Sequence, residues 1–310
     1  MRRWFCQLLP PVLLLLAGLS LGGMAAERDT AAWLPFLLST VLLGLPHGAA
    51  DCWVLARVRP GRGGRGRAVA VYAALLAAAA ALVVLSPALA LAGFLLGSAW
   101  HFGMADSSDL ARFFGATGRP SVLLAFGRGS LLFGLSFAFD PERMVELGGV
   151  WLQLLGDQPF ERPLARHLES VGFGIVGVSL GVTGWAAFRL RHSLGHGALV
   201  WWWVEAVILG FVFWSAPAVF AFGLYFLLWH SVRHLDHLDL GSRGLWGRAK
   251  KLYLRAAPFF IPSLIVLAGA AVLSGSTDSP ERFGVLLLVL FAIVTPAHEW
   301  LVHRELHAPR

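Results

Sequence analysis

The sequence predicts an all-α integral-membrane protein: a polytopic bundle of about ten transmembrane helices that forms a single domain over residues 1–310. Hydrophobic residues make up 57% of the chain and charged residues only 14%, whereas a soluble domain carries about 25% charged residues. The mean hydropathy is +0.69. Most apolar residues fall into long runs separated by short polar breaks, which is typical of helices that cross a bilayer repeatedly.

Each apolar run of roughly 18 to 25 residues is long enough to cross a bilayer as a helix. Breaks such as Ser86-Pro87 are typical of tight turns at the membrane surface. The first segment, residues 1–26, is either an uncleaved first span or a signal-like segment with a small-residue cleavage site. The expected spans are 4–25, 31–56, 68–86, 88–105, 120–139, 168–188, 198–215, 217–231, 256–274 and 284–303.

The distribution of the 25 Lys and Arg residues predicts the orientation. With the N-terminus in the cytoplasm, 19 of them lie on the inside, as the positive-inside rule expects. We therefore expect a multi-pass protein of the cell inner (plasma) membrane with a cytoplasmic N-terminus. The net charge of +7 belongs to these loops, so no nucleic-acid partner is expected. Arg128 lies within a span, and the residues expected outside are Arg28, Arg143, Arg162, Arg166 and Arg282.

Five histidines lie in or beside the apolar runs, and they belong to the segments GLPHGAAD (His47), SAWHFGMAD (His101), LWHSVRHLDH (His230 and His234) and TPAHEWLVH (His298). At about 1.5 Å per residue, all five lie within roughly 15 Å of the cytoplasmic surface. Four separate helices thus bring imidazoles to one depth. A polar ring in hydrocarbon usually has a partner or a function, and imidazole is a common ligand of transition metals. The sequence therefore predicts an intramembrane metal site built from His47, His101, His230, His234 and His298.

The spacing of these residues refines the site. His230 and His234 are four residues apart, so both rings face the same way and can chelate one ion. Asp51 follows His47 at the same spacing and is expected to orient a ligand histidine through a hydrogen bond. His298 is deep enough to be a fifth ligand, although a supporting or packing role is the stronger expectation. Each histidine taken alone is equally consistent with a hydrogen bond between helices.

Three other polar residues lie within apolar runs. Arg128 and Glu205 are expected to pair across helices, and each is a candidate partner for the other. Tyr225, five residues before His230, either reaches toward the site or lines it.

Neutral imidazoles without thiolates suit Fe(II), Zn(II), Cu or Ni. A catalytic metal with an open coordination position is expected rather than a structural zinc. Because the site lies within hydrocarbon, the expected substrate is dissolved in the bilayer. The residues therefore favour oxygen chemistry on a terpenoid or an acyl chain.

The segments GLPHGAAD, SAWHFGMAD and PAVFAFGLYFLLWHSVRH, with Arg128-Gly129, resemble the Brp/Blh family of bacterial and archaeal integral-membrane carotenoid cleavage enzymes. The similarity extends over residues 31–303 and implies that they form a catalytic helix bundle. It implies a β-carotene 15,15'-dioxygenase, which cleaves the central double bond of β-carotene with O2 to two molecules of all-trans-retinal. One departure is TPAHEWLVH, in which Ala297 separates the Pro and His that are adjacent in the family segment.

The resemblance also implies a site and partners. Fe(2+) is held by four histidines, and a retinal-binding opsin is a functional partner. From its position before His230, Tyr225 is a candidate catalytic side chain. Asp51 and His298 are expected beside the metal. By the family motifs the metal ligands are His47, His101, His230 and His234, and the expected wall of the substrate tunnel is Trp100, Phe102, Phe222, Phe226 and Trp229.

Three other classes of protein stay open on sequence grounds. A membrane desaturase or hydroxylase also uses histidine boxes and iron, but it needs about eight histidines, and here only HSVRH fits such a box. A transporter or metal permease would place histidines along its pathway. A non-catalytic, opsin-associated protein would bind retinal without making it.

Overall fold

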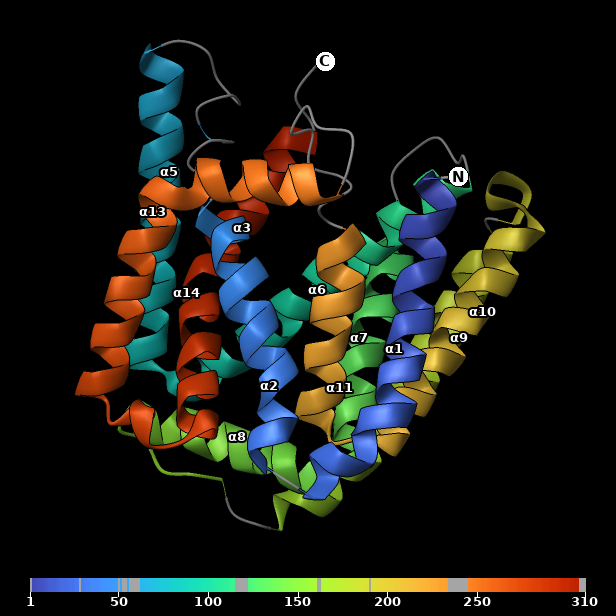
Figure 1. Ribbon diagram of the computed structural model, residues 1–310, viewed down its shortest axis with the longest axis horizontal. Coiled ribbons are helices and arrows are strands. Elements are labelled where there is room, and N and C mark those ends of the chain that lie inside the picture. Colours follow the sequence, from blue (N-terminus) through green and yellow to red (C-terminus); the bar gives the residue numbers. More distant parts are fainter. Residues whose placement is uncertain are drawn as a thin grey trace. The chain divides into compact units, whose positions relative to one another are not determined.

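The computed structural model describes residues 2–27, 29–49, 51, 55, 62–114, 122–160, 163–189, 191–233 and 245–306. Every regular element within these ranges is a helix (Figure 1). The chain divides into two compact units, which are described separately. Unit 1 comprises Met1–Ser39, Ser98–Glu146 and Phe160–Leu238, and unit 2 comprises Thr40–Gly97, Leu147–Pro159 and Asp239–Arg310.

Within the part of the chain that the structure describes, seven helices are long and apolar enough to cross a membrane, and the prediction of an all-α polytopic protein is confirmed. Shorter apolar helices at Leu8–Leu21, Val200–Ser215 and Ala218–Arg233 coincide with the remaining predicted spans. The long ones are Thr30–Ala49, Gly66–Leu85, Pro87–Phe113, Val122–Phe139, Leu164–Arg189, Trp246–Leu273 and Pro280–Val302.

Large apolar side chains stay exposed along several of these helices. Leu85 is 82% exposed and Leu273 is 90% exposed. Soluble proteins rarely leave extended apolar surface in contact with water, so these faces are those of a membrane protein.

Unit 1 is built around α7 (Val122–Phe139), which is buried on most of its faces. It packs along α9 (Leu164–Arg189) (Figure 1). The other helices of the unit are α1 (Arg2–Glu27), α2 (Asp29–Ser39), α10 (Arg191–Ser215) and α11 (Ala218–Leu224), with residues 98–113 of α6 (Pro87–Phe113). Apolar helices in a membrane approach closely where small residues face each other, and α7 and α9 do so at Gly134 and Gly172.

A second close approach joins α6 and α7. A Cβ atom added at Gly103 would overlap the carbonyl of Ala125, and one added at Gly129 would overlap the carbonyl of Ala99. The absence of side chains at these two positions lets the helices pack backbone to backbone beside His101. This contact explains why glycine follows Arg128 in the sequence.

We expect Gly129→Ala to destabilise unit 1 by about 1–3 kcal/mol or more, because α6 must move away from α7 to admit the methyl group. Gly177→Ala on α9 is the matched control, because no atom of a packing neighbour lies within 4 Å of a Cβ at that position. The free energy of unfolding in detergent measures both. Equal stability of the two variants would show that the α6–α7 contact is not this tight.

Asp140 fixes the start of α11. Its Oδ2 accepts a hydrogen bond of 2.9 Å from the backbone N–H of Ala218, the first residue of that helix. A carboxylate in this position satisfies a donor that the helix leaves unbonded. Burial raises the pKa of Asp140, whereas the hydrogen bond from Ala218 and the charge of Arg143 act in the opposite direction.

Unit 2 contains α3 (Leu45–Ala49), α5 (Arg62–Leu85), α13 (Leu245–Leu273), η3 (Ser276–Asp278) and α14 (Pro280–Leu306). It also holds residues 87–97 of α6 and the end of α8 (Pro141–Leu154). Helix α5 packs along α14, and α3 packs against α13. The buried Trp151 of α8 ties this unit together, since its Nε1–H donates to the Pro87 carbonyl at 2.9 Å and its ring stacks on Phe94.

Two π-helical segments interrupt the predicted spans next to candidate histidines. Segment η1 (Thr40–Gly44) ends three residues before His47, and η2 (Tyr225–His230) ends at His230 itself. In η2 the Ser231 backbone N–H and its hydroxyl both bind the Phe226 carbonyl, five residues back. Such widened turns are rare and are frequently found at functional sites.

Candidate metal centre

Unit 1 brings together two of the predicted ligand histidines. The ring centroids of His101 on α6 and His230 in η2 lie 5.2 Å apart. His230 is buried and His101 is half-buried. His234, the predicted ligand four residues after His230, lies outside the described residues. The pair therefore occupies an interior position in the membrane-spanning part of the unit.

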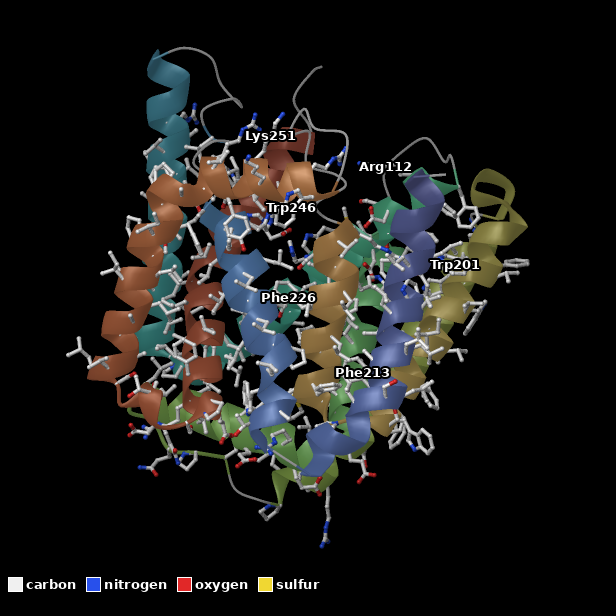
Figure 2. The ribbon with its side chains drawn as sticks, in the orientation of Figure 1. Arg112, Trp201, Phe213, Phe226, Trp246 and Lys251 are labelled. Carbon is white, nitrogen blue, oxygen red and sulfur yellow. The ribbon has the colours of Figure 1, made fainter. Side chains whose placement is uncertain are left out.

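Phenylalanine rings enclose His230. The ring of Phe102 meets it edge-on at 4.9 Å, and the ring of Phe226 stacks on it at 5.4 Å. Figure 2 labels Phe226 on the ribbon that continues α11. Phe102 also contacts Phe222, at 5.6 Å between centroids. Two of the aromatic residues predicted to line a tunnel thus contact the His230 ring, and a third, Phe222, packs against one of them.

The other two predicted tunnel residues pack elsewhere in unit 1. Trp100 contacts Phe126 of α7, with centroids 5.1 Å apart. Trp229 is fully buried between the ring of Tyr225 and the guanidinium of Arg233, which lies 4.5 Å from its ring centroid. Trp229 therefore packs between Tyr225 and Arg233.

Arg233 belongs to a buried charge cluster that also contains Asp106, Arg128 and Glu205. Glu205 joins the two arginines, because its carboxylate oxygens accept hydrogen bonds of 2.6 Å from Arg128 and 2.5 Å from Arg233. Asp106 lies 3.5 Å from the Arg128 guanidinium. The predicted pairing of Arg128 with Glu205 is confirmed. Charges that are this buried remain stable only when they are paired with good geometry.

Two aromatic side chains anchor the charge cluster. Trp201 of α10 donates a hydrogen bond of 2.9 Å from Nε1 to Glu205 (Trp201 is labelled in Figure 2). The Tyr225 hydroxyl donates to Asp106 at 3.2 Å. The ring of Tyr225 lies 6.3 Å from that of His230. Tyr225 therefore lines the histidine site with its ring while its hydroxyl is directed to the charge cluster.

Unit 2 contains a second histidine pair. His47 Nε2 and His298 Nε2 lie 3.1 Å apart, and the two rings are nearly perpendicular. His298 Nδ1 donates to Asp51, whose Oδ1 and Oδ2 lie at 2.8 and 3.0 Å. The Tyr72 hydroxyl donates to Asp51 Oδ2 at 2.9 Å. The structure thus places the carboxylate expected beside His47 in a hydrogen bond with His298.

Sequence reasoning missed Arg233 and Tyr72. Arg233 follows His230 by three residues and Trp229 by four, and this spacing on one helical face was a usable signal. Tyr72 gave no such signal, because its partner Asp51 is 21 residues away on another element.

The fold and these residues define a class: a polytopic helical membrane protein whose spans hold paired histidines, buried carboxylates and phenylalanine rings. The family model described as "Beta-carotene 15,15'-dioxygenase" matches residues 38–304. The chain therefore belongs to the β-carotene 15,15'-dioxygenase family, which confirms the resemblance seen in the sequence.

A curated relative agrees with this assignment. The chain is 30% identical over 299 residues to the probable β-carotene 15,15'-dioxygenase Blh of Halobacterium salinarum, and the alignment covers 87% of this chain and 83% of the relative. No solved structure matches the chain.

Proposed function

We propose that this protein is an iron-dependent β-carotene 15,15'-dioxygenase of the cell inner membrane. It cleaves the central double bond of β-carotene, and one O2 supplies the oxygen atoms of two molecules of all-trans-retinal. The observation that carries the proposal is the His101–His230 pair enclosed by Phe102 and Phe226 within membrane-spanning helices. The family match and the named relative support the same reaction.

The donor set fits iron. The proposed ligands of one Fe(2+) are His47, His101, His230 and His234, as the family motifs imply. Among the described side chains, His101 and His230 lie ring to ring, and His47 lies beside an imidazole that is hydrogen-bonded to a buried carboxylate. Imidazole nitrogens without thiolates suit Fe(II), and a carboxylate behind an imidazole is the usual support of a metal site. When bound, the iron supplies the activation of O2.

The protein's own contribution is to position and shield the substrate. β-Carotene is a hydrocarbon with no polar group to grip, so shape and apolar contact must hold it. The rings of Phe102, Phe222 and Phe226 form a rigid apolar surface next to His230. This surface excludes water from the central double bond. The charge cluster joins the segments that carry the two histidines, since Asp106 is on α6 with His101 and Arg233 follows His230 by three residues.

The proposal also predicts the orientation of the protein in the membrane and its partner. With a cytoplasmic N-terminus, the histidines lie in the cytoplasmic leaflet, within reach of a carotenoid dissolved in the bilayer. Retinal leaves as an apolar aldehyde that stays in the membrane, where a retinal-binding opsin is the expected acceptor.

Metal removal tests the reaction. We expect chelation of the purified protein to abolish conversion of β-carotene to retinal, and Fe(II) but not Zn(II) to restore it, because O2 activation needs a redox-active metal. One iron per chain is expected at full activity, whereas a di-iron desaturase or hydroxylase would hold two. Full activity of the metal-free protein, or the loss of β-carotene without retinal, would contradict the proposal.

A further inference from the structure

We propose that His298 is a protein ligand of the metal that His47 binds, and that Asp51 and Tyr72 are positioning residues which hold His298 in its binding orientation. This inference rests on the iron-dependent function proposed above and deepens it. It adds a ligand to the four that the family motifs imply. All four residues belong to unit 2.

The separation of the two ring nitrogens is that of two imidazoles which bind one metal ion. His47 Nε2 and His298 Nε2 lie 3.1 Å apart, with the rings 81° from parallel. Two imidazole nitrogens bound to one metal at about 2.0–2.1 Å lie about 2.8–3.4 Å apart for bond angles between a right angle and a tetrahedral one. The observed separation falls within that range.

The tautomer of His298 leaves its Nε2 able to bind a metal. Its Nδ1 is within hydrogen-bond distance of both Asp51 oxygens, at 2.8 and 3.0 Å, and a carboxylate can only accept. The proton of a neutral His298 ring is therefore on Nδ1, which leaves the lone pair on Nε2. That lone pair faces His47. A carboxylate that fixes the tautomer and raises the basicity of an imidazole is the usual support of a metal-binding histidine.

Tyr72 in turn stabilises the Asp51 carboxylate through a hydrogen bond. Its hydroxyl donates to Asp51 Oδ2 at 2.9 Å, and Asp51 is 3% exposed. A buried carboxylate is costly unless its oxygens are bonded. Helices α5 and α14, which carry Tyr72 and His298, pack along each other. Tyr72 and His298 therefore both donate to Asp51, which fixes the orientation of the His298 ring and leaves the lone pair on its Nε2.

A hydrogen bond between the two Nε2 atoms, whichever of them carries the proton, gives the same separation. In that case His298 is a structural partner and touches no metal. The two arrangements differ in whether an atom of residue 298 bonds to a bound metal ion. A spectroscopic signal that arises only when residue 298 bonds to the metal therefore distinguishes the two arrangements.

The experiment uses His298→Cys in the full-length protein, purified in detergent, stripped by chelation and titrated with Co(II). A thiolate bound to Co(II) gives a near-ultraviolet charge-transfer band that imidazole ligands do not give. We expect this band in the His298→Cys variant. The wild-type spectrum is subtracted as the reference, because the wild-type protein already contains two cysteines, Cys6 and Cys52. His167→Cys is the control, because His167 is an exposed residue at the start of α9, and it should give no new band.

A second variant keeps His298 in place. Asp51→Asn should raise the Co(II) dissociation constant about 10- to 100-fold, as the loss of a carboxylate behind a ligand imidazole usually does. A missing thiolate band in His298→Cys, together with an unchanged Co(II) affinity in Asp51→Asn, would overturn the inference while the wild-type protein still binds metal and makes retinal. A wild-type protein that makes retinal without binding any metal would overturn the iron-dependent function as well.

Discussion

Replacement of His230 by alanine will lower retinal formation by about 100-fold or more, because the variant lacks an imidazole proposed to bind iron. The same loss is expected for His101→Ala, since the two rings lie 5.2 Å apart in one aromatic enclosure. The measurement is retinal per unit of membrane-inserted protein, together with iron content. Both quantities should fall together.

His167→Ala is the matched control for these variants. His167 is an exposed residue of α9, and its ring nitrogen bonds to the Pro163 carbonyl. Retinal formation and iron content should stay at the wild-type level in this variant. If His230→Ala kept its activity, or lost activity with its iron retained, the proposed role of His230 as a ligand would be wrong.

Replacement of Glu205 by glutamine will destabilise the protein by about 3–5 kcal/mol, as expected when one partner of a buried ion pair loses its charge. The Glu205 side chain is 1% exposed and accepts hydrogen bonds from both Arg128 and Arg233. Without its charge, the two guanidinium groups lose the carboxylate that accepts a hydrogen bond from each of them. The free energy of unfolding in detergent measures the effect.

The control for this variant is Glu146→Gln, which removes a salt bridge of similar length at the surface. Its partner Arg143 lies 2.9 Å away, but the Glu146 side chain is 52% exposed. An exposed pair contributes about 0–1 kcal/mol, so little change is expected. If Glu205→Gln were no more destabilising than Glu146→Gln, the charge cluster would not hold unit 1 together as we infer.

Much of the fold could be predicted, because a transmembrane helix is defined by local composition. The length of each apolar run gave the spans, and the seven long and three short apolar helices found among the described residues fall on them. The pairing of Arg128 with Glu205 was also predictable, because a charge within hydrocarbon needs a partner and the spans offered few candidates. The two π-helical segments were not predictable, since they arise where packing widens a turn.

The candidate site was less accessible to sequence reasoning. Depth in the membrane selected the five histidines, because depth follows from counting residues along a helix. Depth does not say which ring nitrogens meet. The contact between His298 and Asp51 joins residues 247 positions apart, and the bond from Tyr72 comes from a third helix. Such contacts depend on how helices rotate against each other, which composition does not encode.

The most direct test of the account is the retinal content of a β-carotene-accumulating bacterial host that expresses this chain and contains no opsin. We predict a loss of β-carotene matched by two molecules of retinal for each molecule consumed, and no retinal from cells that express His230→Ala. Intact β-carotene in cells with folded protein in the membrane would contradict central cleavage. Retinal binding without its formation would then favour a non-catalytic, opsin-associated role.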